Sequence, residues 1–368
     1  MILLALLAFS WTPGEHRPRP PPAHGPRDPS FFVGEMLHIV PQGRLPFAPS
    51  ETATPVLDSA QTRMYIGTRD GKVRCRFRGQ TAWVFQARGA VLASPLVDGE
   101  TLYVAGGDGW VYALNRFTGA VRWQVDLKEE LTTQPTASEG RLFVMSSEQS
   151  VTALDMKDGK RLWKFHRDPP GGFTIRGDAQ PRIAHGSVFV AFAEGTVAAL
   201  QPKDGVGKWM RQVSGTGDYL DVDWIDAPEA ENRIYVASAK AGVVALDADT
   251  GVPAWTYPLA GANHVTVEGS RVVAGGRGEL VAIDRATGNK LWSLPLGKDK
   301  YSTQPVAMQG IVLVALDRGA LMGVDLKTGA LRSGFDPGSG FSQPVFAVPG
   351  VAYILSNAGS LISLGLLP

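Results

Sequence analysis

Short apolar runs separated by turn residues recur along most of the chain. Each run is four to seven residues long and rich in Val, Leu, Ile and Tyr, with Gly, Asp, Asn or Thr between runs. Residues 101–126, which read TLYVAGGDGWVYALNRFTGAVRWQVD, show this pattern clearly. Runs of this length bounded by turn residues indicate β-strands, and no stretch has the spacing of apolar residues that an amphipathic helix requires. The pattern therefore predicts an all-β protein.

The strands are grouped into units that end with a tryptophan. These tryptophans are separated by 40, 40, 46, 46 and 37 residues and are Trp83, Trp123, Trp163, Trp209, Trp255 and Trp292. An Ala-Leu or Ala-Ile pair precedes most of them, and a Thr-Gly or Asp-Gly turn follows that pair. A repeat of about 40 residues with several short strands is typical of a β-propeller. Because the tryptophan has one fixed place in each unit, we expect every ring to pack at the seam between two neighbouring blades.

The number of units predicts eight blades. One unit begins without a proline near His264, and seven open with one, namely Pro55, Pro95, Pro135, Pro181, Pro228, Pro305 and Pro344. The unit that starts at Phe341 contains only three strands, and the apolar run from Met36 to Val40 can supply the fourth. Glycine turns such as Asp108-Gly109 join neighbouring strands as tight hairpins. We therefore expect an eight-bladed β-propeller of four-stranded antiparallel blades, with the last blade completed by the N-terminal strand.

The N-terminus has a different composition from the repeats. Residues 1–12 include the apolar run MILLALLAFS, which resembles the apolar region of a signal peptide although no Lys or Arg precedes it. Residues 13–33 are rich in Pro and Arg and are expected to form a flexible tether. Residues 34–368 then form the propeller. This organisation predicts export, with a disordered leader as the alternative.

Charge and composition exclude several classes of function. A net charge of +1 and a pI of about 7.9 provide no field that would attract a nucleic acid. The single cysteine, Cys75, excludes a disulfide and a CxxC metal site, and we expect it to pack within a strand. No histidine has a second ligand at metal-binding spacing, and no GxSxG motif marks a nucleophile. The sequence thus predicts no metal site and no catalytic residue. One acidic run is interpreted as a solvated surface and contains Asp221, Asp223, Asp226, Glu229 and Glu231.

Two connections between units are longer than the others. One follows Trp163 and the other follows Trp209, and they account for the two 46-residue spacings. Arg176 lies five residues before Pro181 and Asp223 lies five before Pro228, which suggests equivalent places in successive blades. Since four antiparallel strands alternate in direction, both connections are expected on the same face, side by side.

These two connections have a composition suited to binding a protein. They contain apolar residues beside opposite charges, namely Phe173, Ile175 and Trp224 with Arg176, Asp178, Asp221 and Asp223. Aromatic and Arg side chains are enriched where proteins bind each other. The alternative is an internal ion pair between Arg176 and Asp221 or Asp223 that links two blades, and both interpretations can hold together.

The unit with its Ala-Leu-Asp, Thr-Gly and Trp markers resembles the PQQ-type β-propeller repeat. That resemblance brings quinoprotein dehydrogenases into consideration, in which a quinone lies over a vicinal disulfide beside a Ca²⁺ site. A vicinal disulfide needs two cysteines, and this chain has one. A central cavity of cofactor size with Arg, Asp, Asn and Trp around it would favour such an enzyme, whereas a narrow channel without a cation site would disfavour it.

Two segments resemble the BamB family of the outer-membrane β-barrel assembly (BAM) machinery more specifically. They are FTIRGDAQP at residues 173–181 and LDVD at residues 220–223, and the resemblance extends from about Pro55 to Leu366. It implies a non-catalytic scaffold without a cofactor, in the periplasm at the inner face of the outer membrane. It also implies that this scaffold binds the POTRA domains of BamA and helps to insert unfolded outer-membrane proteins.

The resemblance assigns the BamA contact to five residues, which are Phe173, Ile175, Arg176, Asp221 and Asp223. Members of the family are usually acylated at a cysteine after the signal peptide, and none lies within residues 1–30 here. The association with the outer membrane is therefore expected to be peripheral, with the lipid anchor left open. The alternative function is an exported PQQ-repeat binding protein or a quinoprotein dehydrogenase-like enzyme.

Overall fold

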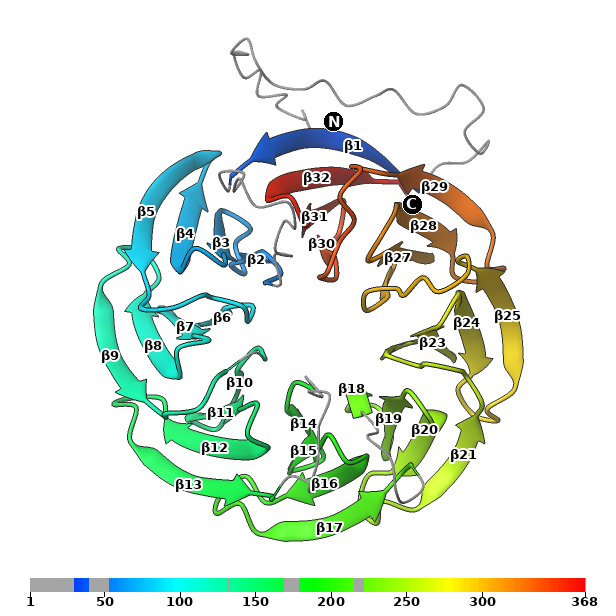
Figure 1. The fold of residues 1–368 in the computed structure, drawn as a ribbon, viewed down its shortest axis with the longest axis horizontal. Helices are drawn as coiled ribbons and strands as arrows, with labels where there is room; N and C mark the ends of the chain where they lie inside the picture. Colours follow the sequence, from blue (N-terminus) through cyan, green and yellow to red (C-terminus); the bar gives the residue numbers. More distant parts are fainter. Residues whose placement is uncertain (1–29, 40–52, 132, 169–178, 215–221, 368) are drawn as a thin grey trace.

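Eight four-stranded antiparallel sheets stand radially around a central axis in the computed structural model of the protein (Figure 1). The structure describes residues 30–39, 53–131, 133–168, 179–214 and 222–367. Each sheet keeps the order of its strands in the chain, from the innermost to the outermost, except the last one. The sheets form a closed ring, which confirms the predicted eight-bladed propeller. No helix occurs in these ranges, and so none that could cross a membrane.

The eight blades follow one another along the chain. Blades 1 and 2 contain β2 (Val56–Leu57), β3 (Arg63–Gly67), β4 (Lys72–Phe77), β5 (Gln80–Gln86), β6 (Leu96–Asp98), β7 (Thr101–Ala105), β8 (Trp110–Asn115) and β9 (Val121–Asp126). Blades 3 and 4 contain β10 (Thr136–Ser138), β11 (Arg141–Met145), β12 (Ser150–Asp155), β13 (Arg161–His166), β14 (Arg182–Ala184), β15 (Ser187–Ala191), β16 (Thr196–Leu200) and β17 (Gly207–Gln212). Blades 5 and 6 contain β18 (Val222–Asp226), β19 (Arg233–Ser238), β20 (Gly242–Asp247), β21 (Pro253–Tyr257), β22 (His264–Glu268), β23 (Arg271–Gly276), β24 (Glu279–Asp284) and β25 (Lys290–Pro295). Blades 7 and 8 contain β26 (Val306–Met308), β27 (Ile311–Ala315), β28 (Leu321–Asp325), β29 (Leu331–Phe335), β30 (Phe346–Val348), β31 (Val351–Leu355), β32 (Ser360–Leu366) and β1 (Phe31–His38).

The N-terminal strand closes the ring, as predicted. β1 pairs antiparallel with β32 from Phe31 opposite Leu366 to His38 opposite Ser360, with a bulge after Val33. The strand overlaps the expected run from Met36 but begins at Phe31, three residues before the boundary predicted at residue 34. Because both ends of the chain lie in one sheet, opening the ring requires breaking a full ladder of backbone hydrogen bonds.

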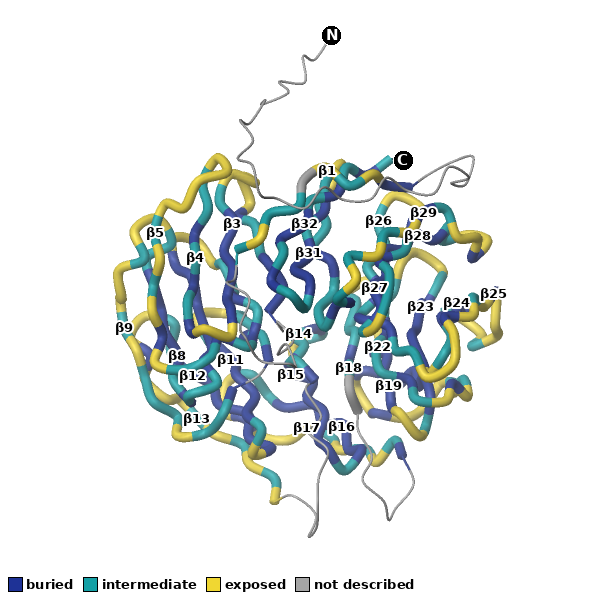
Figure 2. The backbone as a smooth tube through the Cα atoms, turned by 45° about the horizontal axis from the view of Figure 1, so that its top comes forward, coloured by how far each residue is buried: buried dark blue, intermediate teal, exposed yellow. Residues whose placement is uncertain are grey.

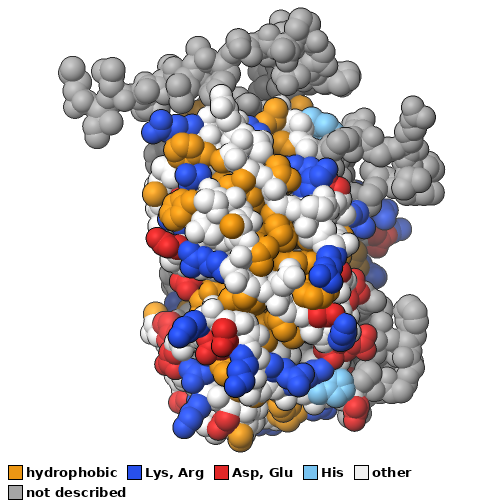
Figure 3. Space-filling view, turned by 90° about the vertical axis from the view of Figure 1, so that its left-hand side faces the viewer, with side chains coloured by type: hydrophobic (Ala, Val, Ile, Leu, Met, Phe, Trp, Pro, Cys, Tyr) orange, Lys and Arg blue, Asp and Glu red, His pale blue; other side chains and the backbone are white. Residues whose placement is uncertain are grey.

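The core lies between neighbouring sheets rather than within any one blade. One cluster, for example, joins Tyr65 and Val73 of blade 1 to Leu102 and Leu114 of blade 2. The second and third strands are buried on both faces, whereas alternate residues of the outer strands are exposed (Figure 2). Cys75 in β4 is buried, which agrees with its expected packing role. On the outer rim, hydrophobic side chains form a band between charged margins (Figure 3).

Six tryptophans join successive blades, as the repeat predicted. Each indole Nε1–H donates a hydrogen bond to a backbone carbonyl of the next blade, at 2.9 to 3.1 Å, as in the pairs Trp83 to Arg116 and Trp292 to Leu326. The carbonyl belongs to the turn between the third and fourth strands. The turn glycine, such as Gly119, packs directly against the indole ring. The Trp and the Thr-Gly marker are therefore two halves of one contact between neighbouring blades.

The tryptophan marker ends at blade 6 because blade 8 is assembled from both ends of the chain. In blade 7 the corresponding residue is Ser333, which pairs with Gly323 as Trp292 pairs with Ala282. The third and fourth strands of blade 8 are β32 and β1, which no turn joins. Ser333 Oγ instead accepts a hydrogen bond of 2.8 Å from the backbone N–H of Ser30, at the start of β1.

Candidate functional site

Most of the predicted partner-binding patch lies outside the described residues. Phe173, Ile175, Arg176 and Asp221 fall in segments that the structure does not describe, and Asp223 lies within β18. The ends of the two connections are described. One runs from β13 to β14 and the other from β17 to β18, so they link blades 3 to 4 and 4 to 5. Because successive strands alternate in direction, both connections attach on the same face as the hairpins between the second and third strands of each blade.

The predicted equivalence of the two connections is wrong in register. Pro181 precedes β14, whereas Pro228 follows β18. The residue of β18 that corresponds to Arg182 is Asp226, because they pair with Phe189 and Tyr235 at matching positions of the second strand. Blade 5 divides its extra residues between the connection before β18, the bulge in β18, and a longer turn between β18 and β19. Part of the second insertion thus lies on the opposite face.

Arg182 of blade 4 contacts blade 5 and interacts electrostatically with Asp226. The side chains of the expected pair between Arg176 and Asp221 or Asp223 lie outside the described part of the chain. Arg182 Nε donates a 3.0 Å hydrogen bond to the carbonyl of Ile225, and Asp226 accepts one of 2.8 Å from the backbone N–H of Val267 in blade 6. Burial lowers the pKa of the Arg182 guanidinium and raises that of the Asp226 carboxyl. Burial opposes both charges, and the electrostatic attraction between them partly offsets this effect.

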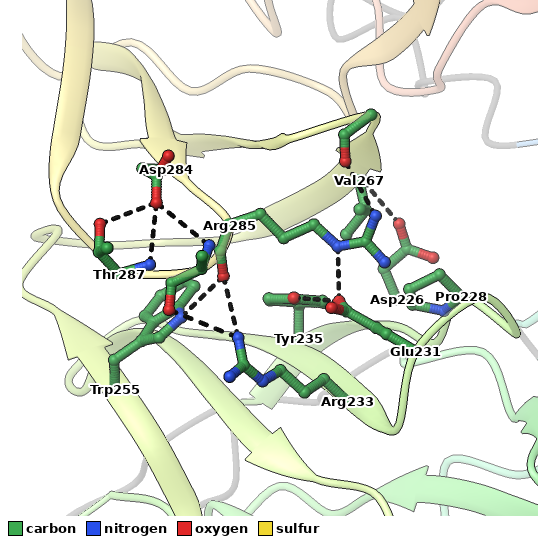
Figure 4. A network of polar contacts seen from close by, with 12 residues as sticks. Asp226, Pro228, Glu231, Arg233, Tyr235, Trp255, Val267, Asp284, Arg285 and Thr287 are labelled. Carbon is green, nitrogen blue, oxygen red and sulfur yellow. Dashed lines mark hydrogen bonds and ion pairs between the residues drawn. The ribbon is translucent and has the colours of Figure 1, made fainter.

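The acidic run is only partly a solvated surface. Glu231 accepts hydrogen bonds from Arg285 Nε, at 2.5 Å, and from the hydroxyl of Tyr235 (Figure 4). The carbonyl of Arg285 in turn accepts hydrogen bonds from Trp255 Nε1 and from Arg233 (Figure 4). Glu231 and Asp226 therefore connect blades 5 and 6, and the solvated interpretation is wrong for both.

A cavity of about 630 Å³ occupies the centre of the ring. Seven of its lining residues share one register position, which lies two residues before Arg182 and before the residues that correspond to it in the other first strands. They are Thr54, Ser94, Gln134, Gln180, Trp224, His264 and Gln304. First strands begin on the face to which the long connections attach. The cavity therefore lies toward that face.

Blades 4 to 6 form an aromatic and charged wall of this cavity. The Arg182 guanidinium lies over the Trp224 ring at 4.8 Å, and Trp224 contacts the His264 ring at 5.3 Å between centroids. Burial lowers the pKa of His264 to about 4, so its imidazole is neutral at pH 7. Trp224, which we expected beside Phe173 in the patch, instead faces the channel.

The sequence had not suggested this wall, although a signal for it exists. When the units are aligned so that Arg182 corresponds to Asp226, seven blades have a polar or aromatic residue at one shared position. These are the seven lining residues named above. The cavity is not a narrow channel, and Arg182, Trp224 and Asn263 line it. Within the described ranges, no three His, Cys, Asp or Glu side chains come together as metal ligands.

Comparison with known proteins identifies relatives of the chain. A family profile described as "Outer membrane protein assembly factor BamB" matches residues 69–223 and 220–334. The protein of that name from Bordetella pertussis is 29% identical over 120 residues, which are 32% of this chain and 30% of that protein. A polyvinylalcohol dehydrogenase from Sphingopyxis sp. is 34% identical over 90 residues, or 22% of this chain and 14% of that protein. The chain thus matches less than a third of the length of these relatives.

The solved structure of BamB from Moraxella catarrhalis has the same fold. Its TM-score is 0.79 at 21% identity, and the match covers 91% of this chain and all of that one. A quinohemoprotein alcohol dehydrogenase from Pseudomonas putida gives a TM-score of 0.73 at 13% identity, over 95% of this chain and 78% of that one. At these identities the likeness concerns the propeller itself.

Proposed function

Because the chain belongs to the family of the outer membrane protein assembly factor BamB, we propose that it is a non-catalytic periplasmic scaffold of the BAM complex. The observation that carries this proposal is the family match, which extends from β4 of blade 1 into β29 of blade 7, in a ring whose eighth blade is complete. A rigid ring of blades suits a scaffold, since it holds its surface connections in a constant relative position. In this role the protein associates peripherally with the inner face of the outer membrane.

The proposed partner is BamA, through its POTRA domains. Phe173, Ile175 and Arg176 would form one part of the contact, and Asp221 with Asp223 the other. Support comes from the described ends of the two connections, which attach to adjoining blades on one face. The hydrogen bond from Arg182 to Ile225 fastens β14 to β18 and thereby holds the two attachment points together.

Charged side chains give the proposed contact with BamA its specificity. Arg176 would make charge-assisted hydrogen bonds to BamA, and Phe173 and Ile175 would exclude water from them. Bound in this way, the scaffold orients BamA for unfolded outer-membrane proteins that arrive for insertion.

A binding experiment with purified BamA POTRA domains tests the site. The double substitution Arg176→Ala with Asp223→Ala is expected to weaken binding by at least about tenfold, since each charged hydrogen bond contributes about 1.5–3 kcal/mol. The matched control is Arg141→Ala with Glu139→Ala, an ion pair of 3.6 Å between the turn after β10 and the first residue of β11, on the opposite face. Unchanged affinity in the first double variant, with cooperative unfolding retained, would reject the site.

The second candidate function is a quinoprotein dehydrogenase-like or other ligand-binding activity in the channel. The specific observation is the cavity of cofactor size with Arg182, Trp224 and Asn263 in its wall. Its described residues do not, however, provide the cluster of oxygen ligands that a cation site requires. Alcohol oxidation by the purified protein in the presence of added pyrroloquinoline quinone and Ca²⁺ would favour the enzyme over the scaffold.

A further inference from the structure

We propose that the central cavity binds a neutral, hydroxyl-rich molecule of the size of one or two sugar rings. This inference is independent of BamA binding, because it concerns the inner wall of the ring rather than the connections on its surface. The cavity volume of about 630 Å³ falls within the range of about 300–1,000 Å³ that is usual for small-molecule sites. A molecule in this position would contact several blades at once.

The charge of the wall argues against an ionic ligand. Among the described residues that line the cavity, only Arg182 carries a full charge at neutral pH. Asp226 interacts with it electrostatically, and an ionised carboxylate at that position offsets the Arg182 charge. His264 is neutral for the reason given above. An anion would be attracted by Arg182 but repelled by Asp226. A cation would be attracted by Asp226 but repelled by Arg182.

The hydrogen-bonding groups of the wall are of both kinds. Trp224 Nε1 is a donor, Asn263 Oδ1 is an acceptor, and both are buried without a hydrogen-bond partner in the described part of the chain. His264 Nδ1 also lacks a partner, since the ring forms its hydrogen bond to the Ser302 backbone. The half-buried Gln304 offers a carboxamide that is both donor and acceptor.

A hydroxyl group matches this mixture because it donates and accepts at the same time. A carboxylate would satisfy only the donors, and a hydrocarbon would leave every group unpaired at a cost of about 1–3 kcal/mol each. Small rotations of the side chains are needed to bring the buried atoms to a ligand. The Trp224 ring and, from blade 8, Phe346 supply apolar surfaces for the C–H faces of a sugar.

Titration calorimetry on the full chain tests the proposal with defined probes. The neutral probes are maltose and mannitol, and the ionic probes are benzoate and inorganic phosphate. Trp224→Phe keeps an aromatic ring but removes the N–H donor, and Gln304→Ala removes the carboxamide. Each is expected to weaken binding of the neutral probe by about tenfold, which corresponds to about 1.4 kcal/mol. Gln124→Ala, an exposed glutamine on outer strand β9, is the matched control and should bind like the parent protein.

Two supporting readouts separate binding from folding. Thermal unfolding of Gln304→Ala should match that of Gln124→Ala, and both variants should keep any affinity for the POTRA domains. Tighter binding of benzoate or phosphate than of the neutral probes would overturn the proposal. So would parental affinity for maltose in both channel variants, or binding of no neutral probe at tens of millimolar.

Discussion

Replacing Gly329 with alanine tests whether the tryptophan seams stabilise the ring of blades. Gly329 has φ of 75°, and a Cβ added there would lie 2.7 Å from atoms of the Trp292 indole. Gly310 in the same blade has φ of 81°, and a Cβ added there would meet nothing within 4 Å. The two substitutions therefore impose the same kind of backbone strain, but only one of them collides with an indole.

The magnitude follows from these two geometries. A residue with a Cβ in the left-handed region costs about 1–2 kcal/mol, so this term is common to Gly329→Ala and Gly310→Ala. Carbon atoms normally approach to about 3.5–4.0 Å, so the Trp292 ring must move by roughly 1 Å. Overpacking of this kind costs about 1–3 kcal/mol, and weakening the 3.0 Å hydrogen bond from Trp292 to Leu326 adds about 1 kcal/mol. We expect Gly329→Ala to be destabilised by about 2–4 kcal/mol more than Gly310→Ala.

Urea unfolding followed by circular dichroism measures this difference. The comparison requires equal m-values, which show that the two variants expose the same surface on unfolding. In a Trp292→Leu background the collision is removed, so the two alanine variants should then differ by much less. Equal destabilisation of Gly329→Ala and Gly310→Ala in the parent chain would refute the role of the close glycine contact.

Three further predictions concern the pair between blades, the buried histidine and the closure of the ring. Asp226→Asn leaves the buried Arg182 charge without its electrostatic partner and is expected to lower the free energy of unfolding in urea by about 1–3 kcal/mol. His264 has a folded pKa of about 4, below its usual 6.5, so it favours the folded state above pH 6.5. That stability should fall by about 3 kcal/mol as the pH drops from about 6.5 to 4, and His264→Asn should abolish this part of the pH dependence. Ser333→Ala removes the acceptor for Ser30 N–H, and hydrogen exchange in β1 should become faster while exchange in β12 stays unchanged.

The repeat was predictable because its markers are local. The glycine in each Thr-Gly turn adopts positive φ between 67° and 77°, a conformation that its residue type already favours. The tryptophan in each unit meets that turn in the next blade, and identical contacts require identical spacing. Closure by an N-terminal strand could be predicted from the three strands of the last unit, because an unpaired sheet edge needs a partner.

The register of blade 5 was not predictable from the markers. Pro228 resembled an opening proline, but β18 ends before it and contains a bulge. Counting residues from a proline cannot show a bulge, because the bulge appears only in the pairing of two strands. For this reason Trp224 was expected in a surface connection, whereas it faces the cavity.

The amino-acid sequence by itself determined the strands, the turns, the number of blades and the residues that join them, since each depends on residues within about one repeat. Only the tertiary structure decided which side chains meet across blades. Arg182 and Asp226 are 44 residues apart, and Ser30 and Ser333 are 303 apart. The radial arrangement of the sheets brings Arg182 and Asp226 together because it places the same register position of neighbouring blades side by side. Ser30 and Ser333 meet at the outermost strands, where blade 8 closes the ring.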